Sequence, residues 1–464
     1  MTDPTFKINR RIALQLMASA GIVASSKTLL ANAEKGQTTT TKTPQSTLSS
    51  FGATGTRFNL EEAQRVMHEL KVDALVLGDG RNFQQATGCL PVIAKMGWPT
   101  LNLAILVAKP EPKVLIVMLG FSYYYMAADL HTFPNNDVFL YGFGVTDDIK
   151  EQAALNSFRF TDRGEAPLSD IERKRLSSSR AILKQEALRN SMGKALHDAL
   201  KSADVSAGHI AFDNADIGQL ITQFTPKATQ TNADDALRRI RTIKSPTEIE
   251  LMRASSAINV ASAKAAVQQI GTGASHKDLR RAYNSELSKR DARSVFMVID
   301  HVTDEQFDAD LIDGQAFVID CVCDHLGYLG DYGRTVFIGE PHKASRKAQI
   351  TVGKAWDLLR SKLKPGLKFS EIEALGQQAM REQGTTYRVP FKPHSVGVFH
   401  SDHYGNGSSA PREDIVLRPG MIISIDCPVL ETGIGGSVHL EDLMLITEDG
   451  AEPLHDLGQQ AIYI

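Results

Sequence analysis

The sequence predicts two consecutive domains, the first of α/β class and the second of α+β class. Three observations support this fold class. The chain has 464 residues, which exceeds the size of one ordinary domain. In the first half, short apolar runs alternate with helical patterns, whereas in the second half helices are interleaved with strands of antiparallel type. We therefore expect an α/β domain over residues 51–232 and an α+β domain over residues 233–464.

The expected elements of the first domain begin with a helix that Asn59-Leu60-Glu61-Glu62 opens. A short apolar run over 72–77, followed by glycines, predicts a buried strand and a turn. The stretch over 169–200 is expected to be mostly helical, with Ser169 and Glu172 as its capping box. Further strands are expected over 101–107, 114–118 and 210–212.

The second domain is expected to begin with a long helix whose start is well marked. Ser245 is a good N-cap, Pro246 suits the first helical position, and Glu248 completes a capping box. Gly271 is a natural stop for this helix. Further helices are expected over 275–290, 345–363 and 370–383, the last with Ser370 and Glu373 as its capping box. Strands are expected over 317–322, 334–338, 421–426 and 442–447.

The composition excludes several classes of protein. Hydrophobic residues make up 42% of the chain and charged residues 23%, the balance of a soluble globular protein. The net charge of −3 gives no basic surface for nucleic acid. No stretch of about 18 apolar residues in the expected domains predicts a membrane-spanning helix. Four cysteines are too few for a disulfide framework, so we expect reduced or buried thiols. They are Cys89, Cys321, Cys323 and Cys427.

The N-terminal segment has the features of an export signal. Arg10-Arg11 precedes a mildly apolar run over 13–24, and Ala31-Asn32-Ala33 offers a cleavage site between small residues. The adjacent arginines resemble a twin-arginine signal, which exports folded proteins. We therefore expect residues 1–33 to be removed and the mature protein to be periplasmic or secreted. The alternative is a frayed amphipathic N-terminus. Residues 34–50 contain a threonine-rich run and are expected to form a disordered linker.

Two aspartates fall on or beside late apolar strands. Asp320 ends the run Ala316-Phe317-Val318-Ile319, and Asp331 follows Gly330. A strand, a turn and a returning strand would bring both carboxylates to one place. Carboxylates at the ends of apolar strands are costly unless a positive group compensates them, and a divalent cation is the obvious group. The alternative is a surface hairpin with solvated acids.

Three more candidate metal ligands follow. His394 lies in a loop pattern after Pro393, Asp426 ends an apolar strand, and Glu441 precedes Asp442. Four carboxylates and one imidazole suit two divalent metal ions such as Mn, Fe, Co or Zn, provided that carboxylates bridge them. Paired metals can deprotonate a water and polarise a carbonyl. Each candidate also has a non-functional interpretation. Asp426 could be a solvated acid at the end of a strand, and His394 could be an ordinary loop histidine. Of Glu441 and Asp442, either could be the solvated acid.

This ordered set resembles the pita-bread family, which includes proline-specific aminopeptidases, prolidases and creatinase. The five candidate ligands fall in order on the family's metal-ligand positions. The surroundings of His394 and Arg412-Glu413-Asp414 are similar to creatinase. The resemblance implies an α+β pita-bread catalytic domain preceded by a smaller α/β creatinase-type N-terminal domain. Other matching segments are Asp313-Gly314, Gly330-Asp331-x-x-Arg334-Thr335, Arg418-Pro419-Gly420-Met421, Glu441-Asp442, 237–252, Arg81-Asn82-Phe83 and Thr87-Gly88.

The resemblance also implies a role for each candidate ligand. Asp331 and Glu441 would bridge two metals. Asp320 would hold one metal, and His394 with Asp426 would hold the other. Asp426 would also act as the general base toward the bridging water. The family further implies a homodimer that acts on a small peptide or other small molecule.

Three histidines are candidates for binding the substrate or stabilising the transition state. The family places such a histidine shortly after His394, and both His400 and His403 compete for this role. His301, upstream of Asp313-Gly314, resembles the family's other substrate-binding histidine. Sequence spacing does not choose between His400 and His403, because one lies nearer to His394 than usual and the other farther.

Four departures from the family pattern bear on the activity. Asp426 stands where the family usually has glutamate, and Val322 stands where it commonly has glycine. His439 stands where many of its peptidases have arginine, and Pro393 stands where a glycine or another small residue is usual. The leading hypothesis is a metal-dependent hydrolase of the Xaa-Pro aminopeptidase or prolidase type, which cleaves an amide bond. The alternatives are a creatinase-like C–N hydrolase without metal, a metal-dependent lyase, and a non-catalytic binding protein.

Overall fold

The computed structural model describes most of the chain beyond residue 54. The predicted export signal and linker, residues 1–50, lie outside the described residues, as do Arg412 and Glu413. Ala53–Ile464 forms one compact unit. The described residues are 55–78, 80–90, 94, 96, 100–108, 111–130, 133, 137–142, 166–183, 189–404 and 414–464.

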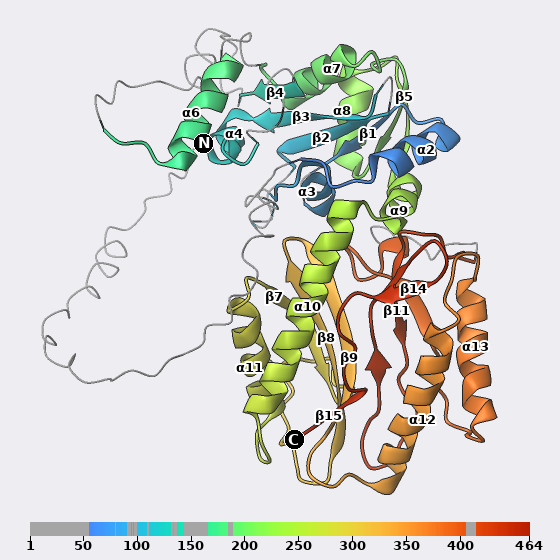
Figure 1. Cartoon of the computed structure of the whole chain (residues 1–464). Helices are drawn as coiled ribbons and strands as arrows, with labels where there is room; N and C mark the ends of the chain where they lie inside the picture. The colour runs from blue at the N-terminus through green and yellow to red at the C-terminus, as the bar shows by residue number, and fades with distance from the viewer. Residues whose placement is uncertain are drawn as a thin grey trace, which may run out of the picture. The chain divides into compact units, whose positions relative to one another are not determined.

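The first part of the described chain is built on a mixed sheet in the order β4-β3-β2-β1-β5-β6 (Figure 1). β1 pairs antiparallel with β2, and β2 pairs antiparallel with β3. The other three pairs, β1 with β5, β5 with β6 and β3 with β4, are parallel. Alternate residues of one strand face two separate cores, with Leu75 and Leu77 on one side and Ala74 and Val76 on the other. The strands are β1 (Ala74–Leu77), β2 (Asn102–Val107), β3 (Lys113–Leu119), β4 (Val138–Tyr141), β5 (His209–Phe212) and β6 (Thr229–Asn232).

Helices pack on both faces of this sheet. The cluster on one face includes residues of α2, α3 and α9, and the cluster on the other includes residues of α7 and α8. The predicted helix start is confirmed, since α2 begins at Leu60, and the side chain of Asn59 caps it by accepting from the backbone N–H of Glu62. The helices are α2 (Leu60–Leu70), α3 (Arg81–Thr87), α4 (Gly120–Met126), α6 (Asp170–Leu183), α7 (Met192–Ser202), α8 (Ala215–Phe224) and α9 (Asp234–Thr242).

The helical stretch predicted over 169–200 is interrupted. The backbone N–H of Glu172 donates to Ser169 Oγ at the start of α6, which is one of the two hydrogen bonds of the predicted capping box. A second helix, α7, begins after its own N-cap, Ser191, whose side chain accepts from the backbone N–H of Lys194. The interruption was not predicted, because the sequence pattern on both sides of it is helical.

The second part of the chain contains two sheets flanked by two pairs of helices (Figure 1). One sheet has the order β12-β9-β8-β7 with β15 beside β9, and the other has the order β10-β11-β13-β14. The strands are β7 (Arg293–Ile299), β8 (Ala316–His325), β9 (Tyr328–Phe337), β10 (Lys392–Ser395), β11 (Ile422–Asp426), β12 (Leu440–Glu441), β13 (Met444–Ile446), β14 (Ala451–Pro453) and β15 (Ala461–Tyr463). The helices are α10 (Pro246–Gln269), α11 (His276–Ser288), α12 (Lys343–Arg360) and α13 (Phe369–Glu382), with a short 3-10 turn η3 (Asp402–Tyr404).

The start of α10 confirms its predicted capping box. Ser245 Oγ accepts from the backbone N–H of Glu248, and the Glu248 carboxylate accepts from the backbone N–H of Ser245. This pairing satisfies two of the N–H groups that a helix start leaves open. The helix ends two residues before Gly271.

The capping box predicted at Ser370 and Glu373 is wrong. Helix α13 begins at Phe369, and the backbone N–H of Lys368 donates instead to the carboxylate of Glu371. The chain turns earlier because the backbone N–H of Phe369 is held by the carbonyl of Ile415, on a neighbouring segment. Ser370 therefore lies inside the helix and donates its hydroxyl to Asp414.

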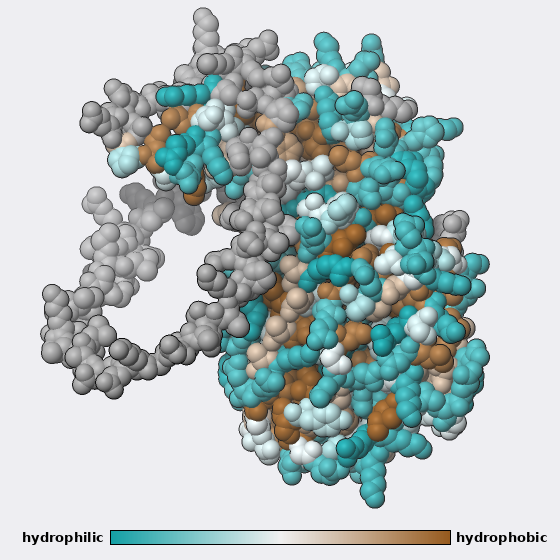
Figure 2. All heavy atoms as spheres, viewed as in Figure 1, coloured by the Kyte–Doolittle hydropathy of each residue, from teal (hydrophilic) through white to brown (hydrophobic). Residues whose placement is uncertain are grey.

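The described surface and interior agree with the composition. All four cysteines are buried and none forms a disulfide in the described part of the chain, as expected. Hydrophilic side chains cover much of the face shown in Figure 2, and hydrophobic ones form separate patches among them. Among the described helices, none combines the length and the apolar character that a bilayer-spanning helix needs.

Candidate active site

The hairpin of β8 and β9 brings the two predicted aspartates together. Its turn at Leu326 and Gly327 has positive φ angles of 52° and 90°, which allow the chain to reverse within two residues. Asp320 pairs with Gly333 and Val322 pairs with Asp331, so both carboxylates lie on the same face of the sheet, diagonally opposed. The predicted strand, turn and returning strand are therefore confirmed.

Two strands of the other sheet add the next two ligand candidates. His394 lies on β10 opposite Ser424 of β11, and Asp426 ends β11 two residues later. Side chains two residues apart on a strand share a face, so the imidazole and this carboxylate point to the same side. The His394 Nε2 atom lies 3.5 Å from an oxygen of Asp426 and 3.7 Å from an oxygen of Asp331.

Glu441 lies between the two pairs. It sits on β12 beside Gly333 of β9, and its Oε1 atom lies 3.3 Å from His394 Nε2. The hydroxyl of Ser424 donates to the same oxygen at 2.6 Å. Hydrogen bonds from both histidines near it, His394 and His439, outweigh the effect of burial and hold the pKa of Glu441 well below its usual range.

A backbone hydrogen bond on the side away from the carboxylates fixes the orientation of the His394 ring. Its Nδ1–H donates to the backbone carbonyl of His400 at 2.9 Å. This bond fixes the ring with Nε2 facing the carboxylates, and a supporting hydrogen bond of this kind is typical of a metal-binding imidazole. The bond also ties the ligand candidate to the loop that carries His400.

The structure separates the two competing histidines. His400 Nε2 lies 3.3 Å from Asp331 Oδ2, and its side chain remains 39% exposed. His403 is buried, and its Nδ1 accepts from the backbone N–H of Ser395. Burial and neighbouring positive charges lower the pKa of His403 to about 3, so this ring is neutral. His400 therefore lies at the carboxylates, whereas His403 lies behind them.

His301 lies at the edge of the same region. It occupies an exposed turn after β7 with a positive φ of 63°. Partial burial and the charge of His439 lower its pKa against the opposing effect of Asp300. His301 is not among the groups of residues that lie within metal-binding distance of one another in the described chain.

His439 is a site residue that the predicted site did not include. Its ring is 4% exposed, and its Nε2 atom lies 3.2 Å from Glu441 Oε2 and 3.9 Å from Asp426 Oδ1. Burial opposes protonation, but the hydrogen bond and charge of Glu441 and the other acids raise the pKa of His439 to about 9. Its spacing of two residues from Glu441 was a signal that could have revealed it, because residues two apart in an extended chain point to the same side.

Among the described residues, the acids of the cluster pair with no arginine or lysine, and three of them share histidines instead. Asp331 is fully buried, and neither of its carboxylate oxygens has a hydrogen-bond partner among the described residues. Burial and the charge of Glu441 raise the pKa of Asp331 well above its usual range, that of Asp320 to about 7 and that of Asp426 to about 6. Crowded, buried carboxylates of this kind fit a divalent cation.

Among the residues that the structure describes, three groups of ligand atoms are close enough to hold a metal ion. Within each group the ligand atoms lie no more than 4.8 Å apart. The groups share residues and form one continuous site of carboxylates and imidazoles. They are Asp331 with His394 and His400, Asp320 with His439 and Glu441, and His394 with Asp426 and Glu441.

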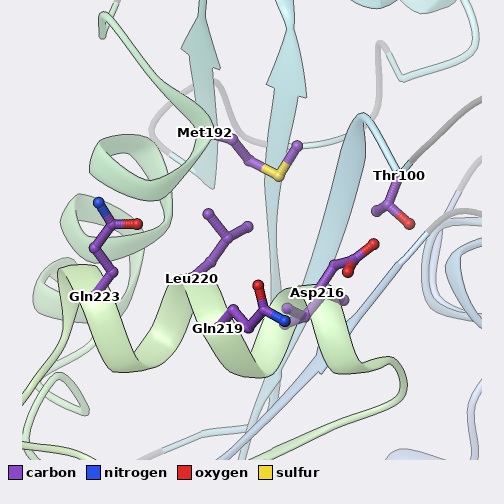
Figure 3. Close-up of a pocket in the computed structure, with 7 residues that line it drawn as sticks. Thr100, Met192, Asp216, Gln219, Leu220 and Gln223 are labelled. Carbon is purple, nitrogen blue, oxygen red and sulfur yellow. The ribbon is translucent and has the colours of Figure 1, made fainter.

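A separate hollow lies on the first part of the chain. Its volume of about 260 Å³ is below the range of about 300–1,000 Å³ that is typical of small-molecule sites. Met192 and Leu220 face each other across it, and Asp216 contributes a carboxylate (Figure 3). None of the cluster residues lines it. The lining residues are Thr100, Met192, Asp216, Ile217, Gln219, Leu220 and Gln223.

Known proteins similar in sequence to this chain include metallopeptidases and dipeptidases. Residues 250–448 match the model of metallopeptidase family M24. The chain is 28% identical over 246 residues to a probable dipeptidase PepE of Mycobacterium tuberculosis, covering 50% of this chain and 63% of that protein. It is 25% identical over 234 residues to the Xaa-Pro dipeptidase of Pyrococcus furiosus, covering 48% and 65%. The matched region thus spans less than two thirds of these relatives.

Solved structures resemble a larger share of the chain. A dipeptidase from Pyrococcus horikoshii superimposes with a TM-score of 0.62 at 16% identity, covering 87% of this chain and 99% of that one. A Xaa-Pro dipeptidase from Bacillus anthracis gives a TM-score of 0.59 at 16% identity, with the same coverage. These likenesses confirm the predicted pita-bread fold, preceded by an N-terminal region.

Proposed function

We propose, on the premise that residues 250–448 form a metallopeptidase domain of family M24, that this protein is a metal-dependent hydrolase of an amide bond. The observation that carries the proposal is Asp331, which is fully buried while neither of its carboxylate oxygens accepts a hydrogen bond from the described residues. Three further acids surround it at the junction of two sheets. The names of its relatives support a dipeptide or short peptide with proline after the scissile bond as the substrate.

Two divalent ions are the proposed cofactors, chosen from Mn, Fe, Co and Zn. Asp331 and Glu441 are the proposed shared ligands, as the family resemblance implies, and a carboxylate oxygen of each lies within 3.7 Å of His394 Nε2. Asp320 lies on one side, and His394 with Asp426 on the other. When bound, such ions polarise a carbonyl oxygen and lower the pKa of a coordinated water.

Asp426 is the proposed general base. Its side chain is 33% exposed, whereas those of Asp331 and Glu441 are buried, so water from the solvent side reaches Asp426 most readily. Burial and Glu441 raise its pKa to about 6, close to the value that suits a proton acceptor near neutral pH. An aspartate here is one methylene shorter than glutamate, which draws the carboxylate back toward β11.

His400 is the proposed substrate-binding histidine. It combines a position 3.3 Å from Asp331 with an exposed edge, so its ring can donate a hydrogen bond to a bound peptide. His301 is the proposed second contact, on the exposed turn after β7. His403 supports the loop rather than the substrate, since it accepts from the Ser395 backbone.

A metal-free hydrolase of a C–N bond, as in creatinase, is the second candidate. The observation that favours it is the pair of buried histidines, His394 and His439, whose pKa values are raised by the carboxylates despite burial. Two imidazolium ions would compensate part of the acidic charge in place of a metal. The crowding of four acids favours the metal reading, because two imidazolium ions leave a net negative charge.

Metal content and a substrate panel test the proposal. The full chain, purified with and without a chelator, should hold transition metal and hydrolyse Xaa-Pro dipeptides or Xaa-Pro-Yaa peptides. Chelation should abolish the activity, and adding Mn²⁺, Co²⁺ or Zn²⁺ should restore it. A protein that takes up none of these ions, and that cleaves creatine with equal rate in the presence of the chelator, would support the second candidate instead.

We propose export for the chain on the basis of its N-terminal pattern alone. Arg10-Arg11, the apolar run and Ala31-Asn32-Ala33 support a twin-arginine signal and a periplasmic or secreted mature protein. Fractionation of the native host and sequencing of the mature N-terminus test this. An uncut chain confined to the cytoplasm would refute it.

We propose a homodimer on the basis of family resemblance. Light scattering on the purified full chain at micromolar concentration tests it, and a stable monomer would refute it.

A further inference from the structure

We propose that His439 is a metal ligand of this site, in addition to the five residues on the family's ligand positions. This inference rests on the proposed metal-dependent function. It assigns an imidazole to the pocket formed with Asp320 and Glu441, where the matching position of many peptidases carries arginine. The class of ligand is a late first-row divalent ion such as Zn²⁺ or Co²⁺.

The residues that support this proposal are neighbours in one row across three strands. Glu441 of β12, Gly333 of β9 and Asp320 of β8 pair side by side. The glycine leaves a gap between the two carboxylates, and His439 fills it: a Cβ at position 333 would come within 2.3 Å of His439 Nε2. The ring is thus placed between the acids that flank the gap.

Burial and hydrogen bonding place this ring inside the site. His439 is 4% exposed, and its Nε2 lies 3.2 Å from Glu441 Oε2. Its backbone is fixed, because its N–H donates to Thr335 Oγ1 and its carbonyl accepts from the same hydroxyl. Asp320 Oδ1, in the same group, is buried without a hydrogen-bond partner among the described residues. One carboxylate oxygen and one imidazole are therefore available to the same ion.

The competing role for His439 is that of a fixed cation, as arginine would be. Charge balance argues against it in the metal-loaded protein. Four carboxylates are matched by two divalent ions, so a further positive charge is not needed.

A nitrogen ligand in this pocket changes which metals the site prefers. Imidazole suits Zn²⁺, Co²⁺ and Ni²⁺ better than it suits Mn²⁺ or Mg²⁺, which favour oxygen ligands. With His394 on the other side of the cluster, each of the two proposed positions would have an imidazole. The site would then bind Co²⁺ more tightly, relative to Mn²⁺, than a site with arginine at position 439.

The test compares His439→Gln and His439→Arg with wild type in the full chain, using Co²⁺ alone as the probe. His455→Gln is the matched control. His455 is equally buried and contacts the neighbouring acid Asp442 at 2.9 Å, but it lies outside the three candidate groups. Circular dichroism and the Tm of the metal-free proteins verify folding. The readouts are Co²⁺ stoichiometry, Co²⁺ affinity, and the number of strongly shifted, exchangeable imidazole N–H signals in the NMR spectrum.

Both His439 variants should bind one Co²⁺ at least about tenfold more weakly than wild type and lose one shifted N–H signal. His455→Gln should match wild type in all three readouts. Wild-type stoichiometry, affinity and signal count in His439→Arg would show that position 439 supplies only positive charge, and would overturn the inference while leaving the proposed function intact. If the arginine variant does not fold, the signal count of His439→Gln decides. A wild-type protein that takes up no Co²⁺ would instead refute the proposed function.

Discussion

Glu441 and Asp442 are neighbours in the chain and each is about 1% exposed, yet their surroundings differ. Asp442 accepts from Arg334 at 2.6 Å and contacts His455 at 2.9 Å, so it has fixed partners of opposite charge. Glu441 instead faces three other acids and two histidines. The comparison teaches that a buried acid with its own arginine is structural, whereas buried acids that share too few cations form a binding site.

The strongest test of this contrast is Asp331→Ala. If Asp331 is shared by two metals, its loss removes a ligand from each, whereas Asp320→Ala removes ligands from one. We expect turnover to fall on the order of 10³-fold or more for Asp331→Ala, because the metal-activated water is lost. Metal content and turnover of both variants, beside wild type and with circular dichroism as the folding check, measure this.

If Asp331→Ala retained both its metal and its activity, the interpretation of the acid cluster as a metal site would be refuted. The metal-free hydrolysis described as the second candidate would then be the better account. Equal losses in the two variants would show instead that Asp331 is a terminal ligand rather than a shared one.

The two competing histidines extend the same comparison. His400→Gln should lower turnover on the order of 10²-fold while metal content is retained, because this partly exposed ring is the proposed substrate contact and not a proposed ligand. His403→Gln should instead lower the Tm, because this ring supports the Ser395 backbone from a buried position. Kinetics and thermal unfolding of both variants separate the roles, and the reverse pattern would exchange them.

Asp442→Asn tests the structural side of the contrast. The substitution removes the negative charge and leaves Arg334 buried without its ion partner, so we expect a loss of about 3–5 kcal/mol in the free energy of unfolding. Metal content per folded molecule should not change. Urea unfolding of the metal-free variant measures the loss, with the exposed Glu448→Gln as the control. Loss of metal without loss of stability would contradict the assignment.

Much of this contrast could be predicted from the sequence. The apolar runs and the glycines between them predicted the β8–β9 hairpin, and hence that Asp320 and Asp331 meet. The residues alone left Glu441 and Asp442 as alternatives, and only the family pattern chose Glu441. The structure gives the physical reason: Asp442 is paired with Arg334 and His455, whereas Glu441 faces the other groups of the cluster.

What could not be predicted depends on contacts between distant segments. Loop spacing did not choose between His400 and His403, because the loop's path is set by a buried ion pair between Lys244 and Asp402 at 2.8 Å. Asp402 also accepts from the backbone N–H of Phe399, beside His400. His439 was missed because its role depends on the space above Gly333, which belongs to another strand.

Glu62 offers the mildest test, because it is a buried acid whose two arginine partners are partly exposed. Burial raises its pKa, but hydrogen bonds from Arg65 and Arg418 outweigh this and lower it from 4.5 to about 2. Because the folded-state pKa is depressed, the stabilisation is present above pH 4.5 and is lost as the pH falls toward 2.

Glu62→Gln should therefore lower the free energy of unfolding at pH 7 and change it little at pH 2. The cost should be about 1 kcal/mol or less, since both arginines are partly exposed. Urea unfolding of both proteins at pH 7, 5, 4 and 3 measures the difference, and a gap that widens toward acid would show that Glu62 behaves like the acids of the cluster instead.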